Sequence, residues 1–380
     1  MKREFWFVMM IALLCSGTAM AYPQFIAHGY NTCMTCHFNP VGGGPLNDYG
    51  RALGSNTISG RAFVPKDMSE DNLAKYSGFF FKESKSAIKP YANIRGLYIT
   101  NQYRRDNSES EYIPMEAKLG LTYQWGQDKS FIFSGSMSYN PGRSDSEVED
   151  KWRSREHFVG YRSKKNWGVY VGLLDKAFGL RIPDHNAISK STNNLAQDDQ
   201  SHGILFNYLE DKWNVNVHAF VGNMTQDAEL RQTGGSARFE YNFSKTAVVG
   251  ASLLTSSSDF LDQSIYSIHA KFAPGKLTSL MAEIGKGSKS SAVNSTEENA
   301  LFFWSQHHIR IMRGLYYFTT LEYYDEDSTD DKAMRFGPGI QYFPVQKIEL
   351  RLELINTRVF SEQNSIPDAL DLLAQVHIWL

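Results

Sequence analysis

Polar and apolar residues alternate along most of the chain from about residue 88 onward. The stretches 116–125, 213–221, 237–243 and 347–354 carry an apolar side chain at nearly every second position. Successive side chains of a strand point to opposite faces, so this pattern predicts strands with one apolar and one polar face. A soluble β-sandwich and a membrane β-barrel share that alternation, which therefore leaves both fold classes open.

The lengths of the links between the candidate strands separate these two classes. Tight links such as 127–128 and 244–245 alternate with long ones such as 141–150 and 176–199. Outer-membrane barrels gather short turns at one end and long loops at the other, and their strand count is even. We therefore predict a mainly β fold, a 16-stranded antiparallel transmembrane β-barrel over residues 88–380. Its expected strands are 88–103, 113–126, 129–140, 151–163, 166–175, 200–209, 213–223, 232–244, 246–256, 262–273, 276–285, 299–311, 314–325, 332–343, 347–357 and 369–380.

The final strand and the polar strand faces fit the barrel as well. Apolar side chains occupy every second position from Leu370 to Leu380, a pattern similar to the C-terminal assembly signal of outer-membrane barrels. Sixteen strands enclose an aqueous channel rather than a core of packed side chains. The polar faces carry charges of both signs, which we interpret as ordinary wetting of a pore wall: Lys118, Arg238, Glu240, Glu349, Arg351 and Glu353.

The N-terminus has the features of a secretory signal peptide. Lys2 and Arg3 precede a short apolar run at 5–14, and small residues lead to Ala21. We predict cleavage after Ala21, which makes residues 1–21 the signal peptide. The apolar run is too short to span a membrane as a helix, and no later apolar stretch reaches that length. The formal net charge of −2 over 380 residues gives no indication of a nucleic-acid partner.

The cysteines point to a cofactor. Cys15 lies in the predicted leader, and the other two cysteines belong to the sequence Cys33-Met34-Thr35-Cys36-His37. The pattern C-x-x-C-H is the attachment signature of a c-type haem, with two thioether bonds and the histidine as proximal iron ligand. A zinc site needs a second pair of ligands at similar spacing, and no further cysteine exists outside the leader. We predict one covalent haem c, held by Cys33, Cys36 and His37.

The sequence leaves the sixth ligand of the iron open. His28 is near the motif and offers a neutral imidazole, whereas Met68 lies later in a polar stretch; an open position is the third alternative. His28 would suit a lower reduction potential and Met68 a higher one. Arg51 could pair with a haem propionate, or it could equally lie on the protein surface without contacting the haem. Three consecutive glycines, 42–44, allow the backbone to approach a flat ligand closely.

These residues resemble a known architecture. The order Pro23-x-Phe25, then the C-x-x-C-H motif, then Pro40 through Gly50 and Arg51 resembles the monohaem head of fused cytochrome–porins of the bacterial outer membrane. The resemblance implies a haem c head that precedes a porin barrel and takes part in electron transfer, in some members from ferrous iron. The glycine run and His28 look more like a sister branch of short cytochrome–porins than the iron oxidisers, so ferrous iron is one candidate donor among several.

We therefore expect four segments and an electron-transfer function in the outer membrane of a Gram-negative bacterium. Residues 1–21 form the signal peptide, 22–54 the haem head, 55–87 a connector or plug, and 88–380 the barrel. The head lies on the periplasmic side or in the lumen, and its partners are periplasmic or extracellular electron carriers. The hydrocarbon layer is about 30 Å thick, so one haem relays electrons across it only from the lumen or with a further carrier.

Two other functions remain open at this stage, although an electron carrier is the favoured interpretation over an enzyme. One is a solute porin whose haem is a redox sensor or gate, which would conduct ions differently on reduction. The other is a haem enzyme with an open axial position, which would bind small ligands at the iron.

Overall fold

The protein is described here from a computed structural model. The described residues are 23–62, 64–65, 67–69, 72, 86–103, 107–140, 151–182, 184, 187–196, 198–291, 297–327, 331–360 and 368–379. The predicted signal peptide lies outside them, as does the stretch 73–85 of the predicted connector. Among the described helices, none has the length and apolar character to cross a membrane.

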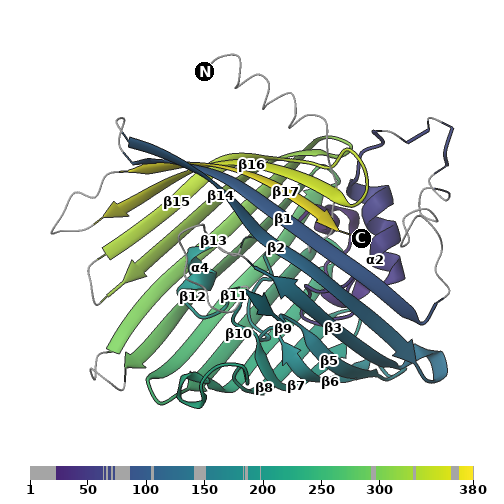
Figure 1. Cartoon of the computed structure of the whole chain (residues 1–380), viewed down its shortest axis with the longest axis horizontal. Helices are drawn as coiled ribbons and strands as arrows, with labels where there is room; N and C mark the ends of the chain where they lie inside the picture. Colours follow the sequence, from purple (N-terminus) through teal and green to yellow (C-terminus); the bar gives the residue numbers. More distant parts are fainter. Residues whose placement is uncertain are drawn as a thin grey trace.

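The described strands form one closed antiparallel sheet, drawn in Figure 1. Apart from β4 and β5, each strand pairs with the next in the chain, and β1 pairs with β17 from Asn93↔Trp379 to Tyr103↔Ala369, which closes the barrel. β4 and β5 both pair with β3, so they share one position in the wall. The described part of the chain therefore builds a 16-stranded barrel, and the predicted fold class is confirmed. The strands are β1 Ile88–Tyr103, β2 Asn107–Trp125, β3 Phe131–Tyr139, β4 Trp152–Arg153, β5 His157–Arg162, β6 Trp167–Leu174, β7 Ser201–Leu209, β8 Trp213–Val221, β9 Thr233–Ser244, β10 Ala247–Ser257, β11 Leu261–Gly275, β12 Thr278–Ser291, β13 Glu297–Met312, β14 Leu315–Glu326, β15 Asp331–Tyr342, β16 Ile348–Phe360 and β17 Ala369–Trp379.

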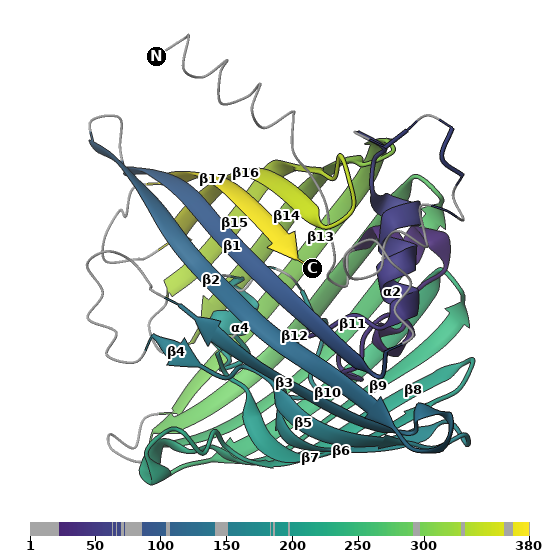
Figure 2. The ribbon, with the colours of Figure 1, turned by 45° about the vertical axis from the view of Figure 1, so that its right-hand side comes forward.

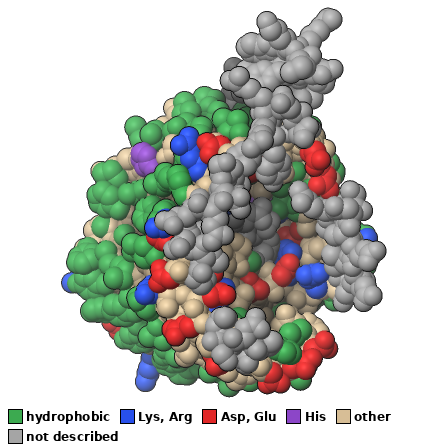
Figure 3. Space-filling model, turned by 90° about the vertical axis from the view of Figure 1, so that its left-hand side faces the viewer, with side chains coloured by type: hydrophobic (Ala, Val, Ile, Leu, Met, Phe, Trp, Pro, Cys, Tyr) green, Lys and Arg blue, Asp and Glu red, His purple; other side chains and the backbone are tan. Residues whose placement is uncertain are grey.

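The two faces of the wall differ as the alternation predicts. Apolar side chains such as Leu119 and Leu253 are exposed on the outer face, whereas charged ones such as Glu240 and Glu353 are buried on the inner face. Figure 3 looks onto the end with the long loops and shows hydrophobic side chains gathered on the outer flank, with charges around the mouth. This inside-out distribution is that of a barrel in lipid, since a soluble protein rarely exposes so large an apolar surface.

The two ends of the barrel are unlike each other. Tight turns, among them the β7–β8 and β9–β10 turns, lie at one end together with the C-terminal residue of β17; we call it the turn end, and the opposite end the loop end. Around the turn end, outward aromatic rings lie 4.5 to 6.5 Å from their neighbours, the girdle expected at a membrane interface. It includes Tyr123, Trp125, Phe131, Tyr161, Trp167, Phe206, Trp213, Phe239, Tyr241 and Phe243.

Two segments extend into the barrel from its opposite ends, as Figures 1 and 2 show. Residues 23–60, which we call the head, enter at the turn end, and the β6–β7 loop, 175–200, folds inward from the loop end. The short helices of the head are η1 Pro23–His28, η2 Cys33–Thr35, α2 Asp48–Leu53 and η3 Gly54–Ile58; the loop carries α4 Ile188–Ser191, and η5 Gln127–Lys129 and η6 Ala228–Leu230 lie in other links. Ile26 of the head, Leu180 of the loop and Trp304 of β13 belong to one buried apolar cluster.

Polar contacts to the wall hold the head in place. Gln24 donates from Nε2 to Gln341 Oε1 at 2.6 Å, and Lys89 Nζ lies 2.5 Å from Asp48 Oδ1. The guanidinium of Arg162 donates to the carbonyl of Phe38. A head in the lumen is therefore part of the barrel's interior rather than a domain beside it.

Candidate functional site

Cys33, Cys36 and His37 face one cavity inside the barrel. The backbone nitrogens of Cys36 and His37 both donate to the carbonyl of Cys33, at 3.1 and 2.9 Å, so one tight turn gathers the three side chains. The atom-free space that they line measures about 680 Å³ and is partly open to solvent. Within the described chain, the two cysteines are free thiols.

The ionisation states of these groups suit a haem better than a reactive redox dithiol. Complete burial, aided by the charge of Arg181, lowers the pKa of His37 to about 4, although the backbone of Gly43 and Gly44 opposes the shift. A neutral imidazole is the form that binds iron. Burial, with a smaller contribution from Cys33, raises the pKa of Cys36 to about 12. Reactive redox dithiols use a thiolate with a lowered pKa, which is the opposite trend.

Three cations line the same cavity, and one of them is only partly hydrogen-bonded. Arg181 comes from the β6–β7 loop, Arg238 from β9 and Lys271 from β11. Arg181 Nη2 lies 3.0 Å from Asp175 Oδ2, and Lys271 Nζ lies 2.6 Å from Glu240 Oε1. Arg238 is 2% exposed and donates from Nη1 to the carbonyl of Gly179 at 3.4 Å, whereas its Nε and Nη2 have no hydrogen-bond partner among the described residues.

Glu240 is a charged neighbour of Arg238. Buried N–H groups without an acceptor are nevertheless costly, so Nε and Nη2 favour an acceptor such as a carboxylate at that position. A haem carries two propionate carboxylates, and the remaining lining supplies apolar contacts for its ring, from Phe25, Ile26, Leu46, Leu180 and Met281. Two thiols, an imidazole, apolar walls and cations therefore converge on one space. The residues present fit a covalently bound haem c.

The three glycines 42–44 allow backbone conformations and close contacts that residues with a side chain would not. Gly42, Gly43 and Gly44 have φ values of 87°, 77° and 58°, which other residues rarely adopt. A Cβ on Gly44 would lie 2.1 Å from Glu156 Oε2, and one on Gly42 would lie 3.1 Å from Cys33 Sγ. The sequence predicts a close approach to a flat ligand here; the structure shows close approaches to the Cys33 thiol and to a carboxylate of the wall.

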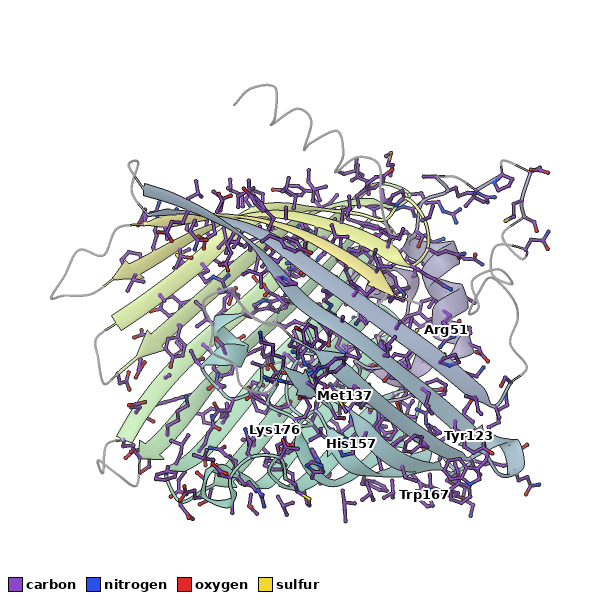
Figure 4. All side chains as sticks on the ribbon, in the orientation of Figure 1. Arg51, Tyr123, Met137, His157, Trp167 and Lys176 are labelled. Atoms are coloured by element: carbon purple, nitrogen blue, oxygen red, sulfur yellow. The ribbon has the colours of Figure 1, made fainter. Side chains whose placement is uncertain are left out.

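The structure separates the other predicted site residues from this cavity. His28 lines a different, smaller cavity with Lys276, His308 and Arg310; partial burial and the charges of Arg310 and Lys276 lower its pKa. Arg51 lies on α2 at the turn end, labelled in Figure 4, where its Nε donates to the carbonyl of Leu46 at 3.3 Å.

Met68 lies in the connector, where its carbonyl accepts from Arg61 and its N–H donates to the carbonyl of Pro65 at 3.1 Å. The described residues around the cavity thus include Cys33, Cys36 and His37 and exclude His28, Arg51 and Met68.

The sequence did not predict four residues of the cavity lining as site residues: Arg181, Arg238, Lys271 and Met281. Arg238 was predicted as a lumen charge without a link to the haem motif. Alternation shows that a residue faces the lumen, but it does not show which lumen residue lies opposite a motif 200 positions earlier in the chain.

Comparison with known proteins shows the fold. No protein-family profile matches this sequence, and no curated protein matches it. Among solved structures, an anion-selective porin from Comamonas acidovorans is similar, with 10% identity, a TM-score of 0.60, and coverage of 78% of this chain and 100% of that one. The outer-membrane protein OmpT of Vibrio cholerae has 9% identity, a TM-score of 0.61, and coverage of 78% and 99%. The outer membrane channel DcaP of Acinetobacter baumannii has 15% identity, a TM-score of 0.57, and coverage of 79% and 99%. The chain has a porin-like barrel fold.

Proposed function

We propose that this protein is an outer-membrane electron carrier in which a covalent haem c lies inside the lumen of a porin-like barrel. One observation carries the proposal: the C-x-x-C-H motif faces the same cavity as a buried arginine, Arg238, whose Nε and Nη2 have no hydrogen-bond partner among the described residues. An exported barrel with a haem attachment motif also accounts for the predicted signal peptide, since c-type haems are attached outside the cytoplasm.

Each residue around the cavity has a stated task in this proposal. Cys33 and Cys36 hold the ring through thioether bonds, and the neutral imidazole of His37 binds the iron. Arg238 pairs with a propionate, with Arg181 and Lys271 close by in the lining. The bound haem supplies one-electron chemistry, with the iron alternating between ferrous and ferric states. The apolar side chains exclude water and so keep the environment of the ring dry.

The cavity lies nearer to the turn end than to the loop end. Lys271 and Met281 are each within four residues of the β11–β12 turn at Gly275 and Thr278, a distance of about 10–13 Å along a strand. Short turns of outer-membrane barrels face the periplasm. A periplasmic carrier is therefore the nearest exchange partner, and the β6–β7 loop stands between the haem and the outside.

A solute porin with a haem gate is the second candidate. The similarity of the fold to an anion-selective porin and to a channel favours it. The filling of the lumen by the head and the β6–β7 loop favours the electron carrier, since both segments pack against the wall with buried apolar clusters.

Proteoliposomes test the proposed function. The purified protein is inserted into vesicles that enclose an oxidised electron acceptor, and a reductant that does not cross the bilayer is added outside. We expect reduction of the enclosed acceptor with wild-type protein and none with a haem-free Cys33→Ser/Cys36→Ser barrel. Equal rates with both proteins, or ionic conductance without electron transfer, would favour the solute porin.

A further inference from the structure

We propose that Met281 of the barrel wall is the sixth ligand of the haem iron. The inference rests on the proposed haem site and deepens it. The sequence points to His28, Met68 or an open position, and the structure places both side chains outside the lining of the cavity.

Met281 is an apolar residue on the otherwise polar inner face of β12. β12 alternates between buried and exposed positions, and the inward neighbours of Met281 on this strand are Ser279 and Glu283. Met281 is 4% exposed and lines the same cavity as His37. Its cluster contains Ile26 of the head and Leu180 of the loop, so it lies where the wall, the head and the loop meet.

The other potential iron donors in the lining are already engaged. Cys33 and Cys36 are required for the thioether bonds. The hydroxyl of Tyr30 accepts a hydrogen bond from Tyr49 at 2.9 Å. Lys271 donates to the carbonyl of Asn31 at 3.0 Å and pairs with Glu240.

The thioether of Met281 is neutral at every pH and needs no hydrogen bond. It is therefore the donor in the described lining that is free to bind iron opposite an imidazole.

His28 is prevented from reaching the cavity by the anchoring of η1. Gln24, in the same turn, bonds to Gln341 on β15, and Gly29 donates to the carbonyl of Ile26 at 2.9 Å. Bringing the His28 ring to the iron would require this turn to unwind and leave its buried contacts.

A methionine ligand from the wall has two consequences. The iron joins the head to the barrel through His37 and Met281, so haem attachment strengthens the docking of the head in the lumen. Methionine–histidine ligation also raises the reduction potential relative to bis-histidine ligation. The closed coordination sphere fits outer-sphere electron exchange and leaves no position for a substrate.

The visible spectrum of the detergent-purified holoprotein tests this ligand. We expect a low-spin wild-type haem that does not bind carbon monoxide, with the weak long-wavelength charge-transfer band of a thioether on ferric haem. In Met281→Leu that band disappears, the ferrous form binds carbon monoxide stoichiometrically, and the potential falls. Met137→Leu is the matched control, because Met137 on β3 is 49% exposed on the outer face (Figure 4). His28→Ala keeps the wild-type spectrum.

A second variant covers the case in which Met281→Leu folds poorly. Met281→His retains a low-spin haem at a lower potential if position 281 binds the iron. In the reduced wild-type protein, the ligand methyl group gives a proton resonance shifted far upfield by the ring, and it is absent from both variants.

A Met281→Leu spectrum identical to that of the wild type, or a wild-type haem that binds carbon monoxide, overturns the inference. Haem that stays covalently bound in these variants leaves the proposed function intact, whereas absence of haem from the wild type overturns the proposed function itself.

Discussion

The barrel and the head encode their structures in different ways. In the barrel, a period-two pattern repeats over sixteen wall positions, and each strand pairs with its neighbour in the chain, β1–β17 excepted. In the head, regular structure is limited to a few short turns, and its partners lie far away in sequence: Gln24 bonds to Gln341, and Phe38 to Arg162. The alternation that specifies the barrel is repeated in every strand, whereas the position of the head depends on contacts of single residues.

This difference has an energetic consequence. A segment as short as 23–60 cannot bury enough surface to be stable alone, so the wall supplies most of the stabilising contacts. Substitutions in the head are therefore expected to have larger effects than similar ones in the wall. The four predictions below test this contrast, from the largest expected effect to the smallest.

The largest effect is expected at the two cysteines. Cys33→Ser/Cys36→Ser removes both thioether bonds, so a haem stain after denaturing electrophoresis loses all signal from this protein. The barrel still forms, because its wall does not include these residues. Met34→Leu, within the same motif, keeps full staining; a stained double variant would contradict the assignment of the motif.

Gly44 gives the next largest effect. In Gly44→Val the positive φ of 58° alone costs about 1–3 kcal/mol, and the contact with Glu156 adds to it. We expect the head to lose protection from protease and the yield of attached haem to fall. Gly275→Val is the control, since a Cβ at Gly275 meets no described atom within 4 Å. Equal protection of the two variants would show that the head does not dock at the wall as described.

His37 makes the docking of the haem-free head depend on pH. Its pKa is about 4 in the folded protein, below the ordinary value of 6.5, because the buried ring resists protonation. Its contribution is present in full above pH 6.5 and is lost as the pH falls to about 4, a change of about 3 kcal/mol. Protease protection of the haem-free cysteine variant, with and without His37→Gln, isolates this contribution from other titrating groups. Parallel pH profiles would argue against a buried neutral ring.

The smallest effect is expected at Arg238. Arg238→Gln leaves a buried propionate without its charged partner, a loss of about 1–3 kcal/mol. Removing a positive charge near the iron favours the ferric form, so the reduction potential falls. Arg358→Gln, with a side chain 47% exposed on the wall, is the control. Equal potentials in the two variants would place the propionates elsewhere.

The sequence predicts the barrel well, for a physical reason, and its prediction of a haem site remains to be tested. A strand in lipid must repeat its alternation, so the boundaries of β1 at 88–103 agree with the prediction. The C-x-x-C-H spacing is local, and Cys33, Cys36 and His37 do converge. Arg181, Lys271 and Met281 show no local signal, because their place in the lining of the cavity depends on how the loop and the wall close around the head. The same holds for His28: the hydrogen bond of Gln24 to the wall determines its position, and its short separation from the motif along the sequence does not.

The mass of the intact protein tests the central claim most directly. The wild-type chain is purified in detergent from outer membranes of cells that attach c-type haems, and its mass is measured under denaturing conditions. We predict the mass of the chain that begins at Tyr22 plus one covalently attached haem. A barrel that carries the mass of the chain alone would contradict the account and would leave a porin-like channel with a filled lumen.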